Sequence, residues 1–222
     1  LNLIYNTALV NLVCYSNQLT SLDVSSNTAL TYLDCGSNSL TSLDVTSNTN
    51  LNELSCHVNS ITDLDVSNNT ALTNLTCYLN QITSLDVSNI PGLGSLKANS
   101  NQLSTIDISN NPLLVAIGCS NNNLSSLDVS NNPLLTEIEC GGDDNQQISS
   151  IDVSNNTDLT VLFCYYNQLT YLNMKNGLTD QLSTFYAIGN PSLTCIETLD
   201  PDYATANWTS ANGNIDAGVT FD

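Results

Sequence analysis

One pattern of 21 residues recurs along almost the whole chain and limits what the chain can fold into. Copies of the form LxxLxCxxNx(L/I)xx(L/I)D(V/I)SxNxx begin at Leu9, Leu30, Leu51, Leu72, Leu93, Leu114, Leu135 and Leu159, and the copy at Leu135 carries three extra residues. A unit this short cannot bury its own apolar side chains, so successive copies have to stack on one another. The repeat therefore predicts a single elongated domain.

Alternating residues divide each unit into an inside and an outside. In "YLDCG" and "SLDVS" the alternation puts Leu33 and Cys35, then Leu43 and Val45, on one face of two short extended segments. The turns "SNNTA" and "SNNPL" are rich in Asn and Pro, which favour tight reversals over helix. We therefore expect a mainly β solenoid with two short parallel strands in each 21-residue coil and little or no helix.

The repeat resembles the leucine-rich-repeat signature LxxLxLxxNxL, with Cys in place of its third leucine. Each unit holds the signature almost twice, as "LTYLDCGSNSL" and "LTSLDVTSNTNL", and so looks like the nested bacterial subclass found in surface and secreted proteins of flavobacteria and their relatives. The resemblance implies a right-handed solenoid in a protein that is extracellular or on the cell surface. It covers residues 1–191, starting inside a coil, and the tail at 192–222 resembles the segment that closes such solenoids.

Charge excludes several classes of partner. The chain has 21 acidic residues against two basic ones, Lys97 and Lys175, which gives a net charge of −19. Nucleic acids and anionic membrane surfaces are polyanions, so neither is an expected partner. No apolar run approaches the roughly 18–20 residues that span a bilayer, so we expect no membrane insertion.

Two columns of identical residues are best explained by stacking of the coils. The cysteines are interpreted as a buried column of small apolar side chains, because Ala98 replaces Cys in the fifth copy; disulfides between adjacent coils are geometrically permitted as the alternative. The asparagines are expected to bond backbone groups of their own coil and of the adjacent one. The cysteines are Cys14, Cys35, Cys56, Cys77, Cys119, Cys140 and Cys164, with Cys195 outside the column, and the asparagines are Asn17, Asn38, Asn59, Asn80, Asn101, Asn122, Asn167 and Asn190.

A column of aspartates has two interpretations. Its members should point outward about 4.8 Å apart, a spacing at which like charges repel by on the order of 1 kcal/mol per contact in water. One interpretation is a structural face on which serine hydroxyls and water offset the repulsion, and the other is a face that binds Ca²⁺. No other cofactor is expected. The column comprises Asp23, Asp44, Asp65, Asp86, Asp107, Asp128 and Asp152.

The outward positions of the "LxxLxCxx" half vary from copy to copy, whereas those of the "LDVS" half hardly change. A variable face suits recognition of a partner, although it could also drift because nothing constrains it. Large exposed rings argue against drift, because they are common anchors of interfaces and of sugar stacking. The predicted ligand-binding residues are Tyr15, Tyr32, Asp34, Glu53, His57, Tyr78, Lys97, Glu137, Glu139, Phe163 and Tyr165.

The three extra residues fall on this same face, in "CGGDDNQQI". A bulge there should bring Asp143 and Asp144 near Glu137 and Glu139, and four carboxylates could hold a metal ion or meet a basic patch on a partner. A tolerated surface insertion is the other interpretation.

Catalysis has little support in the sequence. The chain has no GxSxG, no HExxH, no phosphate-binding glycine loop and a single histidine. We therefore predict a non-enzymatic extracellular recognition or adhesion module that binds a protein or a glycan. The alternatives are a structural spacer within a larger surface protein and a Ca²⁺-stabilised surface repeat, and a hydrolase is disfavoured. The sequence leaves the oligomeric state open.

Overall fold

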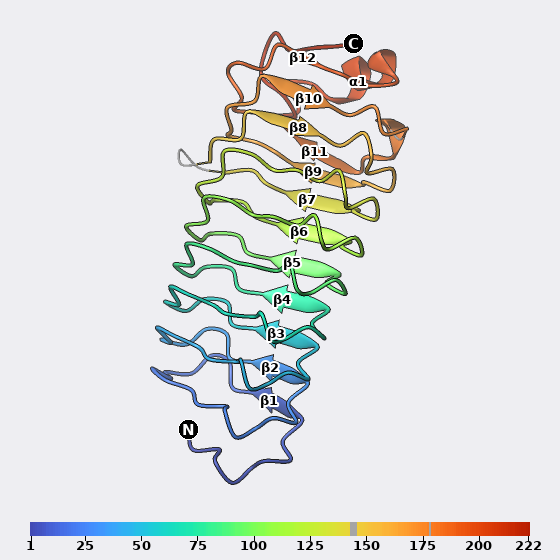
Figure 1. The fold of residues 1–222 in the computed structure, drawn as a ribbon. Coiled ribbons are helices and arrows are strands. Elements are labelled where there is room, and N and C mark those ends of the chain that lie inside the picture. The colour runs from blue at the N-terminus through green and yellow to red at the C-terminus, as the bar shows by residue number, and fades with distance from the viewer. Residues whose placement is uncertain (143–145, 178) are drawn as a thin grey trace.

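The computed structural model describes residues 1–142, 146–177 and 179–222, which form an elongated solenoid with the two ends of the chain at its opposite ends (Figure 1). One parallel sheet of nine strands runs along it in the order β1-β2-β3-β4-β5-β6-β7-β9-β11. This confirms the predicted β solenoid with almost no helix. The strands are β1 (Asn11–Val13), β2 (Tyr32–Asp34), β3 (Glu53–Ser55), β4 (Asn74–Thr76), β5 (Ser95–Lys97), β6 (Ala116–Gly118), β7 (Glu137–Glu139), β9 (Val161–Phe163) and β11 (Thr184–Tyr186).

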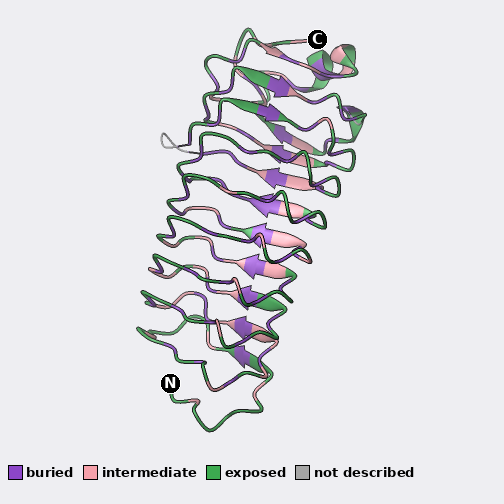
Figure 2. Ribbon diagram, viewed as in Figure 1, coloured by how far each residue is buried: buried purple, intermediate pink, exposed green. Residues whose placement is uncertain are grey.

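Each strand of this sheet buries its central residue and turns the two flanking residues outward. Leu33, Leu54 and Leu75 are in register on neighbouring strands and are almost fully buried. Figure 2 shows the pattern as a buried band through the middle of the strands. The period-two alternation in the sequence therefore sets which residues form the core and which form the outer face.

The cysteine column lies inside the solenoid, as predicted. Six of its members are buried, Cys14 at the first coil is half-buried, and all eight cysteines of the chain are free thiols. Ala98 takes its place in the column with 1% exposure. Burial raises the pKa of the Cys77 thiol to about 12, so the column is neutral at physiological pH.

The prediction of a second strand in each coil is wrong for most of the solenoid. Among the described residues it forms at β8 (Ser150–Asp152) and β10 (Tyr171–Asn173) alone, and these two strands pair with each other in a separate two-stranded sheet. In the other described coils no backbone hydrogen bond joins successive "LDVS" segments. Buried asparagine side chains link the coils there, because a side-chain amide reaches a neighbouring carbonyl that the backbone N–H does not.

The predicted asparagine column bonds both its own coil and the coil before it. Asn59 shows the pattern: its Nδ2 donates to the carbonyls of Cys56 at 3.0 Å and Cys35 at 3.2 Å, and its Oδ1 accepts from the amide of Leu40 at 2.9 Å. In the copy with the insertion, Gln146 replaces the asparagine and donates to the carbonyl of Cys140 at 3.2 Å.

A second asparagine column lies in the turns and is fully buried, although its sequence pattern indicates only turn residues. Asn69 shows its role: Nδ2 donates to the carbonyls of Val45 and Asn48 in the preceding coil, both at 2.9 Å. Ile90 replaces the asparagine in the copy that reads "SNIPG". The fully buried members are Asn27, Asn48, Asn69, Asn111, Asn132 and Asn156.

The residue just before the first asparagine column has a left-handed backbone in seven coils where it is not glycine. The seven are Ser16, Ser37, Val58, Leu79, Ser100, Asn121 and Tyr166. A β-branched residue is rare in this region, so Val58, at φ 51°, is the most strained of them.

We predict that Val58→Asn stabilises the protein, because asparagine tolerates the left-handed region and Val58 is 38% exposed. The expected gain is about 1 kcal/mol, which corresponds to a rise of roughly 2–4 °C in melting temperature for a chain of this size. Val115→Asn is the matched control, because Val115 is similarly exposed, at 43%, without a positive φ. An equal or larger rise for the control would contradict the strain at Val58.

The last residues of the chain cover the free edge of β11. They contain the strands β12 (Cys195–Ile196) and β13 (Thr220–Phe221), which pair in parallel, and the helix α1 (Pro201–Asn207). The amide of Ala187 donates to the carbonyl of Asn214 at 2.6 Å, and Trp208 packs on Phe185 with ring centroids 4.7 Å apart. The division into 1–191 and 192–222 stays a prediction. No helix among the described residues is long and apolar enough to cross a membrane.

Candidate ligand-binding face

The side chains that point outward from the nine-stranded sheet form what we call the strand face. Register places the predicted residues in rows across it, with Tyr32 beside Glu53 and Glu139 beside Phe163. All the described members of the predicted set lie on this face or at the strand ends that border it, and they gather into two groups. That the set binds a ligand stays a prediction.

The first group lies on the N-terminal half of the strand face. The His57 ring stacks on Tyr78 with centroids 4.8 Å apart and an interplanar angle of 26°. Its Nδ1 lies 2.8 Å from the Ser55 hydroxyl, and the His57 side chain is half-buried. Asp34 accepts a hydrogen bond from the amide of Gly36 at 3.0 Å, which engages one carboxylate oxygen within its own coil.

Two tyrosines extend this group toward the N-terminus. Tyr15 lies on the first coil, 53% exposed. Tyr32 lies between Asp34 on its own strand and Glu53 on the next. Desolvation and the two carboxylates raise the pKa of the Tyr32 phenol, so it is neutral at physiological pH.

Glycines at the variable outward positions of the strand face, which we call the variable columns, make room for the neighbouring side chains that lie over them. A Cβ at Gly36 would collide with the His57 ring, and one at Gly141 would lie 2.7 Å from the Tyr165 ring. A Cβ at Gly118 would likewise lie 2.8 Å from the side chain of Asn99. These choices are coordinated between coils, which argues against a face that drifts without constraint.

The second group begins with two glutamates on β7. Glu137 and Glu139 lie two residues apart on one strand and point to the same side. Asn99 reaches across Gly118, and its Nδ2 donates to Oε2 of Glu139 at 2.9 Å. Its Oδ1 accepts a hydrogen bond from the amide of Ser120 at 2.9 Å. Partial burial and the neighbouring Glu139 raise the pKa of Glu137, and Lys97 opposes that shift.

Four aromatic rings lie beside the glutamates. Phe163 stacks on Tyr186 with centroids 5.7 Å apart and meets the edge of Tyr165 at 6.2 Å. Tyr166 makes an edge contact with Tyr165 at 5.7 Å. The predicted set lacks Tyr186, although its spacing in the degenerate copy that begins at Leu182 could have identified it. It also lacks Tyr166, which holds the strained position before Asn167.

Between Glu139 and the rings of Phe163 and Tyr165 is a hollow of about 270 Å³, which we call the acidic–aromatic hollow. The small residue Ser120 lies on its wall between the larger side chains of Asn99 and Tyr165. It is lined by Asn99, Ser120, Asn121, Glu139, Phe163 and Tyr165. The strand face therefore offers a concave site with a fixed carboxylate and fixed rings.

The predicted metal site is not assembled in the part of the chain that the structure describes. Asp143 and Asp144 lie outside the described residues, so their approach to Glu137 and Glu139 stays a prediction. Among the described residues no group of three or more His, Cys, Asp or Glu side chains is arranged to hold a metal ion.

The aspartate column caps its own turns. In Asp44, Oδ1 accepts from the amide of Thr46 at 2.9 Å and from its hydroxyl at 2.6 Å. These hydrogen bonds lower the pKa of Asp44, against the opposing effects of Asp65 and Asp23. The same bond from the amide two residues later forms at the other members, as at Asp107. Local turn chemistry thus accounts for the column, and the Ca²⁺-stabilised alternative stays a prediction.

A scan of protein families and a search of curated proteins return no match. Solved structures do match. The functional domain of InlJ from Listeria monocytogenes, described as including a cysteine ladder, has a TM-score of 0.81 at 31% identity over 89% of this chain and 46% of its own. The Listeria monocytogenes internalin InlF has a TM-score of 0.70 at 28% identity over 88% of this chain and 56% of its own.

A leucine-rich-repeat protein of Leptospira interrogans also matches, with a TM-score of 0.68 at 26% identity over 73% of this chain and 44% of its own. The chain thus spans about half the length of these bacterial chains. The finer resemblance to flavobacterial proteins of the nested subclass stays a prediction. The chain has the leucine-rich-repeat solenoid fold, and its neighbours among solved structures include bacterial internalin-type proteins.

Proposed function

We propose that this chain is a non-enzymatic recognition module that binds a protein partner across its strand face. The observation that carries the proposal is the coordinated choice of residues on that face, where glycines in one coil accommodate rings of the next. A spacer needs only the stacking residues, and those are confined to the interior and the turns. Tyr32 and Tyr78 are half-buried, and partly exposed tyrosines of this kind are typical anchors of protein interfaces.

An extracellular or cell-surface location, with a role in adhesion, is part of the same proposal. It is supported by the likeness to an internalin of Listeria monocytogenes and by the acidic surface, which favours solubility. A glycan is the second ligand class that exposed rings would suit. We favour a protein because the strand face is long and distributes its rings over several coils, whereas a sugar needs one stacking platform.

A binding screen against extracellular proteins, run beside a glycan array, tests the proposal. We predict that the wild-type chain selects a protein and that the double variant Tyr32→Ala/Tyr78→Ala loses at least tenfold in affinity, since anchor residues contribute about 2 kcal/mol each. Its melting temperature should change little.

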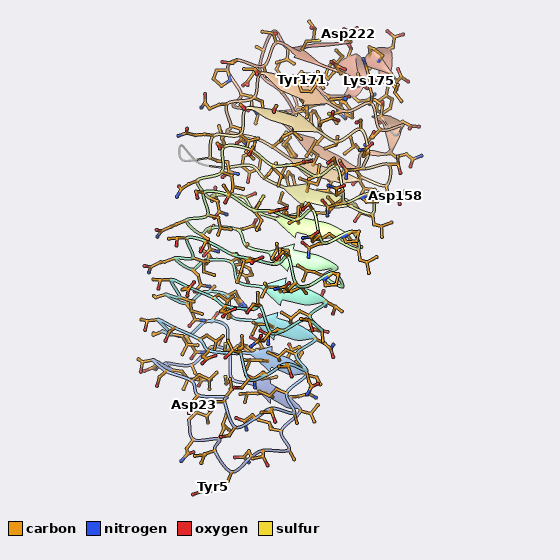
Figure 3. All side chains as sticks on the ribbon, in the orientation of Figure 1. Tyr5, Asp23, Asp158, Tyr171, Lys175 and Asp222 are labelled. Atoms are coloured by element: carbon orange, nitrogen blue, oxygen red, sulfur yellow. The ribbon has the colours of Figure 1, made fainter. Side chains whose placement is uncertain are left out.

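Tyr171→Ala is the matched control, because Tyr171 lies on β10 of the separate sheet and is 39% exposed (Figure 3). It should bind as the wild type does. The proposal would be contradicted if Tyr171→Ala lost binding to the selected protein while Tyr32→Ala/Tyr78→Ala kept it. If only glycans were selected, the ligand would be a sugar instead of a protein. If neither class bound specifically, the spacer interpretation would be favoured.

A further inference from the structure

The acidic–aromatic hollow has the size of a single side chain. Its volume of about 270 Å³ lies below the ~300–1,000 Å³ of pockets that hold drug-sized ligands. It lies toward the C-terminal end of the strand face, on coils separate from those of Tyr32 and Tyr78. It can therefore be tested independently of them.

Among the described residues, no ion pair neutralises Glu137 or Glu139. Lys175 pairs with Glu197 at 3.3 Å at the C-terminal end of the solenoid (Figure 3), and this is the single ion pair among the described residues. Lys97, the other lysine, lies on β5, two strands from β7, and no ion pair forms between it and either glutamate. A cation supplied from outside would relieve the repulsion between Glu137 and Glu139.

The rings beside the carboxylate are held in place before any ligand arrives. Phe163 is directly opposite Glu139 in register, and its stack on Tyr186 has an interplanar angle of 20°. The ring of Tyr165 lies over Gly141, which has no side chain to displace it. A planar cation is stabilised both by the face of an aromatic ring and by hydrogen bonds to a carboxylate. The guanidinium of arginine can make both interactions at once.

We propose that the acidic–aromatic hollow receives an arginine side chain of the protein partner, with its guanidinium against Phe163 and Tyr165 and donating to Glu139. The inference rests on the proposed function, because the arginine is carried by the partner. Asn99 donates to Oε2 of Glu139 and so fixes this carboxylate beside the rings. The net charge of −19 favours the approach of a basic surface. A neutral sugar would use the rings but leave both glutamates uncompensated.

The test uses the whole chain and N-acetyl-arginine amide as a probe, with NMR signals of the Phe163 ring and of the Ser120 and Asn121 amides as the readout. We expect saturable shifts at these signals. The citrulline analogue, which has the same shape without the charge, should bind at least tenfold more weakly. Glu139→Gln should weaken arginine binding by a similar factor while keeping an acceptor for Asn99, and Phe163→Leu should weaken it as well.

Asp63→Asn is the control for loss of a single carboxylate, because Asp63 is exposed and lies outside the strand face, and it should leave probe binding unchanged. Equal binding of arginine and citrulline, equal binding by Glu139→Gln and the wild type, or shifts confined to other coils would overturn the inference. The probe needs no partner, so these results leave the proposed function standing if the Tyr32→Ala/Tyr78→Ala variant still loses its selected protein. A screen that selects no protein would overturn the proposed function even where the probe binds.

Discussion

Asn69→Ala is expected to lower the free energy of unfolding by about 2–3 kcal/mol. The substitution removes two buried hydrogen bonds to the carbonyls of Val45 and Asn48, and each bond is worth about 1 kcal/mol. Each carbonyl keeps one backbone bond, from Asn48 and Leu51 respectively, so neither is fully orphaned. The remaining loss comes from the space left by a side chain with 0% exposure.

The neighbouring asparagine provides the control. Asn68 is exposed and makes one long bond, 3.3 Å to the carbonyl of Thr46, so Asn68→Ala should change the free energy of unfolding by less than about 0.5 kcal/mol. Urea denaturation followed by circular dichroism measures both variants. Equal effects at the two positions would contradict the view that buried amides join the coils on the side that lacks a strand ladder.

Thiol labelling should divide the eight cysteines into two classes that differ in rate by on the order of 100-fold or more. Cys14 and Cys195 are partly exposed and should react with a thiol reagent quickly, whereas the six buried thiols react only when the structure opens. An opening that costs about 3 kcal/mol leaves less than about 1% of molecules reactive at any time. Raised pKa values, well above the usual range for Cys56, slow the reaction further.

Labelling in denaturant without reductant gives the total and serves as the control. All eight cysteines are free in the structure, so eight labels per chain are expected. Fewer labels would show that neighbouring coils are joined by disulfides. Fast labelling of all eight in the native protein would show that the cysteine column is not the interior of the solenoid.

The fold could be predicted from the sequence because each coil repeats the same apolar positions. Leu33, Cys35 and Leu54 are inside because alternate residues of an extended segment point to the same side. An apolar residue facing outward would recur in every coil, so the repeat makes the inward positions unambiguous. The second strand could not be predicted in the same way. Alternation in "LDVS" sets which side chains point inward, as at Leu43 and Val45, but whether neighbouring backbones come within hydrogen-bonding distance depends on the spacing between coils.

Identical letters also conceal different roles. The first asparagine column follows from the leucine-rich-repeat signature, whereas the second, represented by Asn69, looks like an ordinary turn residue until its burial is known. In the copy with the insertion, Gln146 takes the place of the asparagine of the first column, and this depends on the extra length of that loop. The side-chain oxygen of Gln146 accepts from the amide of Asn122 at 3.1 Å, which an aligned sequence does not indicate.

The rows of the strand face follow from the repeat, because positions 21 residues apart fall side by side. Sequence alone could therefore place Glu137 and Glu139 on the same face as Phe163. It could not show that Asn99 bridges two coils to Glu139, or that the His57 ring leans over Gly36, because both depend on side-chain rotamers. The glycines in the variable columns were the available signal, since each stands next to a large or polar residue of an adjacent coil.

Saturation mutagenesis of the displayed chain, sorted separately for folded expression and for binding to the protein selected in the screen, tests the central claim most directly. We predict that folded expression is sensitive at the inward columns and at both asparagine columns. Binding, among variants that express, should be sensitive at outward positions of β1–β7, β9 and β11. Binding-sensitive positions concentrated in the aspartate-bearing segments, or spread evenly over the surface, would contradict the strand face as the site of recognition.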